Sequence, residues 1–202
     1  ETGGFESEES GFAERTIDVS LLGLENLDDN SFYKVKYHLY LNLASGYYEI
    51  GQFGQAYSYY ADCYDFVFGE EDEKLEIDYL WNFGDAALQT DSLNIASDCM
   101  AQLLRVAEKE GDTDFRLRIL RKLGLIYMLM EDFDKSRGYF NQVLDINKSR
   151  NDKKGIAQVH KALAANEFID REYYSCINYA VIADSIYSSL SARSDLQTRG
   201  KL

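Results

Sequence analysis

The sequence has no proline, and among its 202 residues there are only three cysteines and two histidines. Because proline breaks helix interiors, its absence leaves every segment free to form long helices. The histidines, His38 and His160, are too few and too isolated for a Ser-His-Asp arrangement. The cysteines have no CxxC partner and no histidine at ligand spacing, which argues against a metal site. We therefore expect no enzymatic activity, no metal and no cofactor, and we interpret the cysteines as buried, reduced thiols.

Long apolar runs are also missing. No stretch reaches the roughly 18 to 20 residues that cross a bilayer, so we expect no membrane contact in this segment, and no signal peptide is visible. The chain starts at Glu1 without a methionine, and a leader, an anchor or a further domain could precede it. An odd number of cysteines favours a reducing compartment. The expected location is cytoplasmic, with a periplasmic or extracytoplasmic region of a larger protein as the alternative.

Positive charge is scarce, with 21 Lys and Arg against 35 Asp and Glu, for a net charge of −14. Neutralising phosphates requires a basic surface, so a general nucleic-acid binder is excluded and no nucleic-acid partner is expected. The charge is uneven, however. Residues 105–161 carry 13 basic and 9 acidic side chains, so that segment is positive while the remainder is strongly negative. The sequence thus predicts surfaces of different sign along the chain.

What the sequence does contain is a repeat of 40 residues. If Leu117 is position 1 of a repeat, the same frame starts again at Tyr37, Ile77 and Ala157. Positions 7 and 17 are large in every repeat, and positions 8 and 20 are small. Position 7 is filled by Leu43, Phe83, Leu123 and Leu163, and position 17 by Phe53, Leu93, Phe133 and Tyr173. Position 8 is filled by Ala44, Gly84, Gly124 and Ala164, and position 20 by Ala56, Ala96, Ser136 and Cys176. A chance origin is a poor explanation for four columns that stay in phase.

The segment 117–144 resembles a tetratricopeptide repeat. The family pattern is W-x2-L-G-x2-Y followed by A-x3-F, and its positions are filled in order by Leu123, Gly124, Tyr127, Ser136 and Phe140. The resemblance implies an all-α fold, a right-handed α-solenoid of antiparallel helix hairpins with about four repeats and an additional N-terminal helix. The period exceeds the usual value of about 34. We expect the excess to lie in longer helices of about 18 residues, because no loop-like insertion is visible.

The repeat frame divides the chain into segments. Asp72, Asp112 and Asp152 recur at the same spacing, each placed to cap the helix that follows. The expected segments are a disordered acidic tail at 1–11, an N-terminal helix at 12–30, a repeat array at 31–191 with repeats at 37–76, 77–116, 117–156 and 157–191, and a C-terminal tail at 192–202. In the fourth repeat we expect His160 to be an interior residue and Glu167 to be partly exposed at the end of the array.

The resemblance also implies where a partner would bind. In this family, ligands usually contact first-helix positions 2, 5, 6, 9, 12 and 13, which line the concave side of the stacked hairpins. The residues at those columns that we single out are Asn42, Tyr48, Trp81, Asn82, Asp85, Arg118, Arg121, Lys122 and Lys161. The last four form a basic cluster suited to an acidic peptide; the alternative is that they only solvate an exposed helix face.

Three interpretations of the function follow. The leading one is a non-catalytic module that binds a peptide or a partner domain in the groove. The family's carboxylate clamp for chaperone C-termini is doubtful, because Leu41 and Ser45 stand where it needs Lys and Asn. The second is a sensory or regulatory region of a larger bacterial signalling protein, a kinase or a transcription regulator, since long-period repeats look like such arrays. The third is a self-assembling scaffold, a homo-oligomer joined through the repeat ends.

The frame predicts that position 8 is a close helix crossing. Gly124→Val should lower the stability of the folded chain by several kcal/mol, because the added side chain would overpack that crossing. A thermal melt measures this directly. An unchanged melting temperature would contradict the assigned frame.

Overall fold

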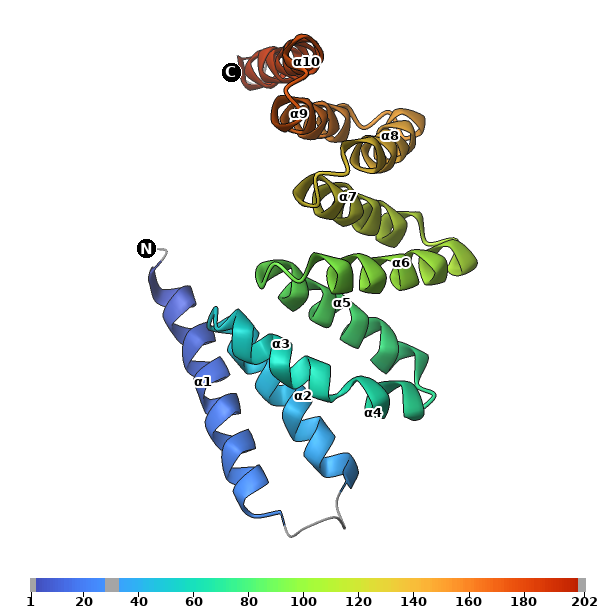
Figure 1. Ribbon diagram of the computed structural model, residues 1–202. Helices are drawn as coiled ribbons and strands as arrows, with labels where there is room; N and C mark the ends of the chain where they lie inside the picture. Colours follow the sequence, from blue (N-terminus) through green and yellow to red (C-terminus); the bar gives the residue numbers. More distant parts are fainter. Residues whose placement is uncertain (1–2, 28–32, 200–202) are drawn as a thin grey trace. The chain divides into compact units, whose positions relative to one another are not determined.

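The computed structural model describes residues 3–27 and 33–199, and over these ranges every regular element is an α-helix (Figure 1). The helices pack in successive antiparallel pairs, so the expected class, an all-α array of helix hairpins, is confirmed. The chain forms two compact units, residues 1–103 and 104–202. No described helix is both long enough and apolar enough to cross a membrane.

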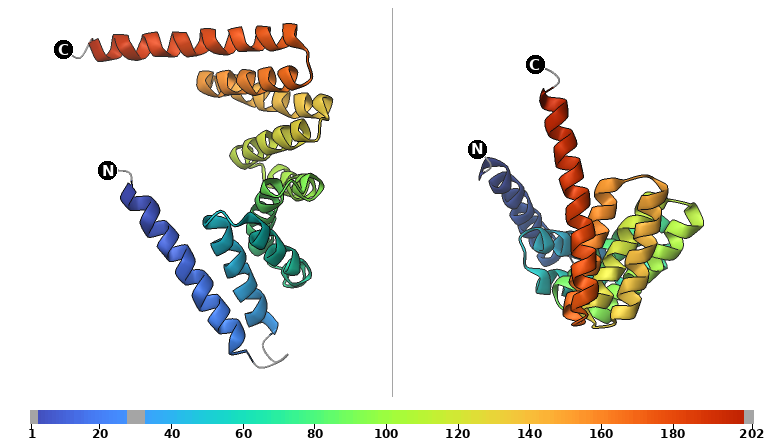
Figure 2. Two further views of the ribbon diagram at one scale, coloured as in Figure 1. Left: turned by 60° about the vertical axis from the view of Figure 1, so that its left-hand side comes forward. Right: turned by 90° about the horizontal axis from the view of Figure 1, so that it is seen from above.

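In its described residues, unit 1 contains three complete helices, one helix that is interrupted into two pieces, and the start of a further helix. It runs through α1 (Gly3–Glu25), α2 (Tyr33–Glu49), α3 (Phe53–Asp62), α4 (Tyr64–Gly69), α5 (Glu73–Gln89) and the start of α6 (Leu93–Glu110). Unit 2 continues from α6 into α7 (Thr113–Leu129), α8 (Phe133–Ser149), α9 (Lys153–Ile169) and α10 (Tyr173–Arg199). Figure 2 shows α10 running beside α9 and continuing past its end.

The helix bounds repeat with the predicted period. The first helices α2, α5, α7 and α9 each have 17 residues, and they begin at residues 33, 73, 113 and 153. The spacing is therefore 40 residues throughout. The observed length also agrees with the expectation that a long repeat lengthens its helices, since the globular mean is only about 11 to 12 residues.

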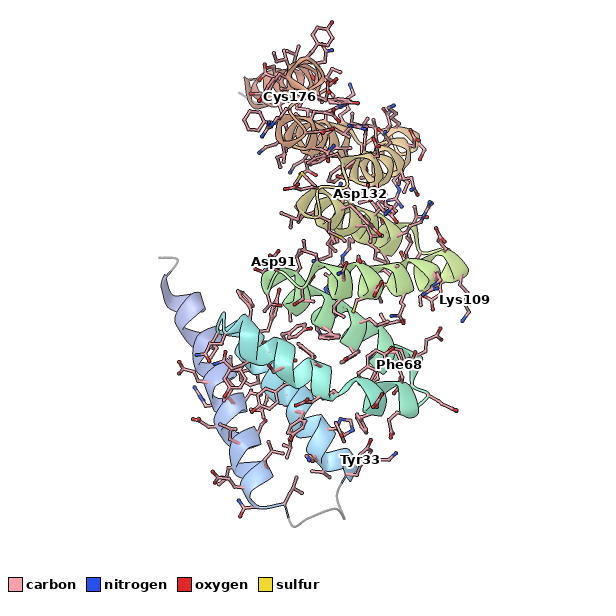
Figure 3. All side chains as sticks on the ribbon, in the orientation of Figure 1. Tyr33, Phe68, Asp91, Lys109, Asp132 and Cys176 are labelled. Carbon is pink, nitrogen blue, oxygen red and sulfur yellow. The ribbon has the colours of Figure 1, made fainter. Side chains whose placement is uncertain are left out.

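The turns between helices share one backbone conformation. From α2 onward, each turn from one described hairpin helix to the next places one residue in the left-handed region, and these residues are spaced by 20: Gly51, Glu71, Asp91, Gly111, Glu131, Asn151 and Arg171. In six of the seven turns, the next amide then donates back five residues, as Asp132 N does to Tyr127 O at 2.9 Å. This is the Schellman arrangement, which ends a helix by satisfying its last carbonyls. Figure 3 marks Asp91 in one such turn and Asp132 after another.

Aspartate caps start the helices that follow. The side chains of Asp72, Asp112 and Asp152 accept hydrogen bonds from backbone amides at the starts of α5, α7 and α9, as the sequence predicts. Asp132 does the same for α8. Each cap satisfies amides that have no partner within the helix, which contributes about 1 kcal/mol.

The close crossing at position 8 is present in unit 2. A Cβ atom on Gly124 would lie 2.6 Å from the Phe140 ring, and the Ser136 hydroxyl donates to the Gly124 carbonyl at 2.8 Å. In unit 1, a Cβ on Gly84 would lie 2.7 Å from Met100. The small columns at positions 8 and 20 therefore face each other across the hairpin, which supports the overpacking expected for Gly124→Val.

Helix α3 ends earlier than a simple hairpin would require. The repeat frame favours one helix from Phe53 to Phe68, but the structure interrupts it at Cys63. The Tyr79 hydroxyl donates a hydrogen bond to the Tyr60 carbonyl at 2.8 Å. The Cys63 amide donates to the same carbonyl, three residues earlier in the chain. A side chain inserted into the helical ladder in this way is a known cause of helix breaks.

The ends of the chain are more helical than expected. The acidic segment 1–11 was assigned to a disordered tail, yet α1 begins at Gly3 and ends at Glu25. Acidic side chains are favourable in the first turns of a helix, so a helix can extend beyond the part that packs. The C-terminal tail at 192–202 is likewise helical as far as Arg199. Residues 1, 2, 28–32 and 200–202 of the predicted segments lie outside the described residues.

Two single glycine substitutions, compared with each other, test the turn geometry. Gly111 has φ +71, so Gly111→Ala should lower stability by about 1 kcal/mol because a side chain is strained there. Gly138 lies inside α8 with nothing near its Cβ position, so Gly138→Ala should raise stability by about 0.5 to 1 kcal/mol. Urea midpoints of the two variants should shift in opposite directions; shifts of the same sign would contradict the turn assignment.

Candidate functional site

The first helices of unit 2, α7 and α9, carry seven basic residues and two acidic ones, Asp114 and Glu167. Segments 115–130 and 153–166, which make up most of α7 and α9, contain no Asp or Glu. Arg118 and Lys161 are exposed, while Arg121 and Lys122 are half-buried. Arg118 lies over the Phe115 ring, with its guanidinium carbon 5.9 Å from the ring centroid. These two stretches therefore contribute basic and no acidic side chains to this face.

A small cavity of about 170 Å³ opens between α7, α8 and α9. Its lining residues are Arg121, Phe140, Gln158, Val159 and Ala162. Three of them, Arg121, Gln158 and Ala162, occupy first-helix positions 5, 2 and 6. The cavity thus combines a guanidinium, an amide and an apolar floor.

Of the predicted residues, the structure brings only Arg121 to this cavity. Arg118, Lys122 and Lys161 lie on the same two helices but do not line it. Sequence reasoning did not single out Phe140, Val159 or Ala162 as lining residues. The first two belong to the buried cluster of unit 2, and no pattern in the sequence tells which edge of a core residue stays accessible.

The predicted residues of unit 1 have a different character. Asn42 and Asn82 are exposed, whereas Tyr48, Trp81 and Asp85 are half-buried. Burial, and then the negative charge of Asp85, raise the pKa of Tyr48. These two side chains, from α2 and α5, are therefore near neighbours. The face they share is polar and acidic rather than basic.

A charged network ties α8 to α9. Arg137 Nε donates to Glu167 Oε1 at 2.7 Å, and the same guanidinium contacts Asp134 at 2.6 Å and Asp170 at 3.2 Å. Glu167 is only 3% exposed, so the expectation of partial exposure is wrong. Its hydrogen bonds are the main cause that holds the pKa of Arg137 above its ordinary value. A buried carboxylate requires such a partner, because an unpaired buried charge is strongly destabilising.

An acidic hollow of about 360 Å³ lies beside this network, at the turn between α7 and α8. It is lined by Met130, Glu131, Asp132, Phe133, Asp134 and Asp170. Structural roles account for its acids: Asp134 and Asp170 bind Arg137, and Asp132 caps α8. Asp132 also accepts a hydrogen bond from Lys135, which lowers the pKa of that carboxyl group.

His160 is an interior residue, as the repeat frame predicts. It is 8% exposed, and its ring stacks on Tyr179 with centroids 5.7 Å apart. Its Nδ1 atom is buried without a hydrogen-bond partner. Burial, and to a lesser extent the charge of Lys148, lower the pKa of His160. The side chain is therefore neutral at pH 7.

The cysteines show no sign of reactivity. Cys63 and Cys99 are buried and free, and burial raises the pKa of each thiol to about 12. Cys176, also free, is half-buried on α10. Since thiolates are the reactive form, the two buried thiols are inert at neutral pH. Within the described part of the chain, no group of three or more His, Cys, Asp or Glu side chains is arranged to hold a metal ion.

Comparison with known proteins identifies the class of this chain. Residues 117–150 match the family model described as tetratricopeptide repeat. The chain is similar to a crystal structure of nearly identical TPR-like repeats of kinesin light chain type from Podosopora anserina, at 14% identity and a TM-score of 0.72, covering 93% of this chain and 90% of that one. It is also similar to BtubC (BKLC) from P. vanneervenii, at 12% identity and a TM-score of 0.50, covering 92% of each. No curated protein matches the chain.

These findings confirm the tetratricopeptide resemblance. The matched family segment starts at Leu117, the residue taken as position 1 of the best-formed repeat. At identities this low, the two structures show the fold alone. The segment 117–150 is thus a tetratricopeptide repeat, and the described chain has the fold of an array of such helix hairpins. Proteins built from these repeats generally mediate protein–protein interaction.

The neutral interior histidine leads to a pH prediction. Because the folded-state pKa of His160 is lowered, the unfolded chain binds more protons below about pH 6.5, and stability falls as the pH drops through that window. His160→Leu introduces leucine, the residue that the second and third repeats have at this position as Leu80 and Leu120. It should stabilise the chain by about 1 kcal/mol at neutral pH by removing an unpaired buried nitrogen.

The advantage of the variant over the parent chain should grow as the pH is lowered from about 7.5 to about 5.5. Urea denaturation of both chains at each pH measures it. A difference that stays constant with pH would show that His160 is equally protonated in the folded and unfolded states.

Proposed function

We propose that this chain binds an acidic segment of a partner protein on the first-helix face of unit 2, formed by α7 and α9. Proteins of this class generally act as interaction modules. The observation that supports the finer proposal is the cavity beside Arg121, on two helices whose segments 115–130 and 153–166 contain basic but no acidic residues. The bound segment takes an extended or helical form along the two helices.

Arg121 is the proposed anchor for a carboxylate. A guanidinium presents two parallel N–H groups that match a carboxylate, and such charge-assisted hydrogen bonds are stronger than neutral ones. The amide of Gln158 lines the same cavity and supplies a donor and an acceptor for the ligand backbone. Arg118, Lys122 and Lys161 surround this site on the two helices and attract further acidic residues.

The same helices also offer apolar contacts. Leu125 lies on α7 at repeat position 9 and is 38% exposed, and Phe168 lies on α9 at repeat position 12 and is 62% exposed. Large exposed apolar side chains on a charged face are typical of binding surfaces, where they supply most of the buried area. We therefore expect the preferred ligand to alternate acidic residues with large apolar ones.

The polar residues of unit 1 form a second proposed contact surface. Asn42, Trp81 and Asn82 would bind polar groups of the partner. The neighbouring Tyr48 and Asp85 would bind basic groups or hydrogen-bond donors of the partner. Carboxylates are acceptors only and amides are both donors and acceptors, so this surface suits a less acidic ligand than the basic face of unit 2 does.

Fluorescence anisotropy with two labelled peptides tests the basic face. One probe is a decapeptide of alternating Glu and Leu, and the other has Lys in place of Glu. The acidic probe should bind, and Arg121→Glu/Lys161→Glu should weaken its binding at least tenfold, because two attractions become repulsions. Raising the salt concentration should weaken it too.

A matched variant separates this site from the effect of net charge. Lys153→Glu/Lys154→Glu makes the same change in charge at exposed positions in the first turn of α9, away from the contact columns. It should keep most of the binding. Equal loss in both double variants, or equal binding of the two probes, would contradict a site at Arg121.

A further inference from the structure

The last helix, α10, has an exposed apolar face. Tyr174 is 80% exposed, Ile177 is 61% exposed and Val181 is 62% exposed. Asp184 and Ser188, which continue the same row, are exposed as well. The spacing of this row alternates between three and four residues. That alternation is the seam spacing of packed helix pairs, so the face is shaped to receive another helix along its length.

The repeat frame shows what packs at this column elsewhere. Ile177 occupies position 21 of its repeat. At the same position in unit 1, Tyr57 packs on Phe83 of the following first helix, with ring centroids 5.4 Å apart. In unit 2, Arg137 at that position binds Glu167 of the following first helix. The exposed face of α10 thus continues the helix–helix interfaces found inside the array.

The first helices of a second copy are not available to cover this face. Each is already packed against the second helix that precedes it in its own chain. A Cβ on Gly46 of α2 would lie 2.8 Å from Ile17 of α1, and α7 contacts α6 through an ion pair of Arg116 with Glu108 at 3.6 Å. Helix α5 packs on α3 through the contact of Phe83 with Tyr57, and α9 binds α8 through the ion pair of Glu167 with Arg137. Among the described helices, α10 and α1 carry the most exposed large apolar side chains.

Charge favours α10 as its own partner. Residues 173–183 carry no charged side chain, so two copies of this segment can approach without repulsion. On α1, the exposed Phe12 and Val19 have the charged Glu14, Arg15 and Asp18 beside them, so pairing two copies there would bring charged side chains into the contact. A contact of α10 with itself also closes with twofold symmetry, the commonest form of homo-oligomer, whereas α1 against α10 would be a heterologous, head-to-tail contact.

We propose that two copies of this chain form a dimer through antiparallel pairing of α10. With the twofold axis between Ile177 and Val181, Ile177 faces Val181 of the partner subunit. The same register places Tyr174 opposite Asp184 of the partner subunit, where the phenol donates a hydrogen bond to the carboxylate. This pairing accounts for the row of residues on α10, because Ile177 and Val181 meet at the centre and Tyr174 meets a polar residue at each edge.

Sedimentation velocity of the full chain tests the dimer. The expected species has twice the monomer mass of 23.2 kDa at high concentration and dissociates on dilution. Ile177→Glu/Val181→Glu should be monomeric at every concentration, with an unchanged helical circular dichroism spectrum because both positions are exposed. The matched control, Val19→Glu/Leu22→Glu on α1, should dimerise as the parent chain does.

Disulfide trapping tests the register without relying on acidic variants. In a Cys176→Ser background, a mixture of the chains carrying Ile177→Cys and Val181→Cys should give mainly the mixed disulfide dimer on mild oxidation. Each variant alone should cross-link much less. A parent chain that stays monomeric, an α1 variant that alone abolishes association, or preferential cross-linking of Ile177→Cys with itself would overturn the proposal.

Discussion

The close approach of two helices at one small residue in each repeat is the constraint on which the rest of this structure depends. In the third repeat, the ring of Phe140 occupies the space where a side chain on Gly124 would begin, and the Ser136 hydroxyl donates to the Gly124 carbonyl. This contact fixes how far along its axis each second helix sits against the first. Once that register is set, the large residues at position 7 lie in the core, and the first-helix residues at positions 2, 5 and 6 are left facing outward.

The turns keep this register from one helix to the next. A left-handed residue every 20 positions ends each helix, and an aspartate cap begins each first helix of the repeats after the first. Five of the seven left-handed residues are not glycine, and an ordinary residue in that conformation costs about 1 to 2 kcal/mol. The turn geometry is thus maintained against local preference, because the hairpin contacts on either side over-determine it.

Much of this could be predicted from the sequence, and the exceptions have physical causes. The period, the small columns and the aspartate caps are visible because they recur at fixed spacing. The ion pair of Arg137 with Glu167 occurs once and joins residues 30 positions apart, so no periodicity reveals it. The break at Cys63 depends on where the Tyr79 hydroxyl points, which is a property of side-chain geometry and not of pattern. For the same reason, the frame placed Arg121 on the contact face but could not show that Phe140 and Val159 border its cavity.

Function in this chain is expected to lie in what the repeats leave exposed. The basic face of α7 and α9 and the apolar row on α10 use different columns of one frame, so a bound peptide and a second copy would not compete for the same side chains. Both surfaces depend on the repeat register. Hydrogen exchange of the backbone amides tests that register most directly. The account predicts slow exchange within the helices from α2 to α9 and fast exchange of the first amides of each helix, with the minima in protection about 20 residues apart, apart from the added break at Cys63. Protection that runs through the turn residues, or minima without this spacing, would contradict it.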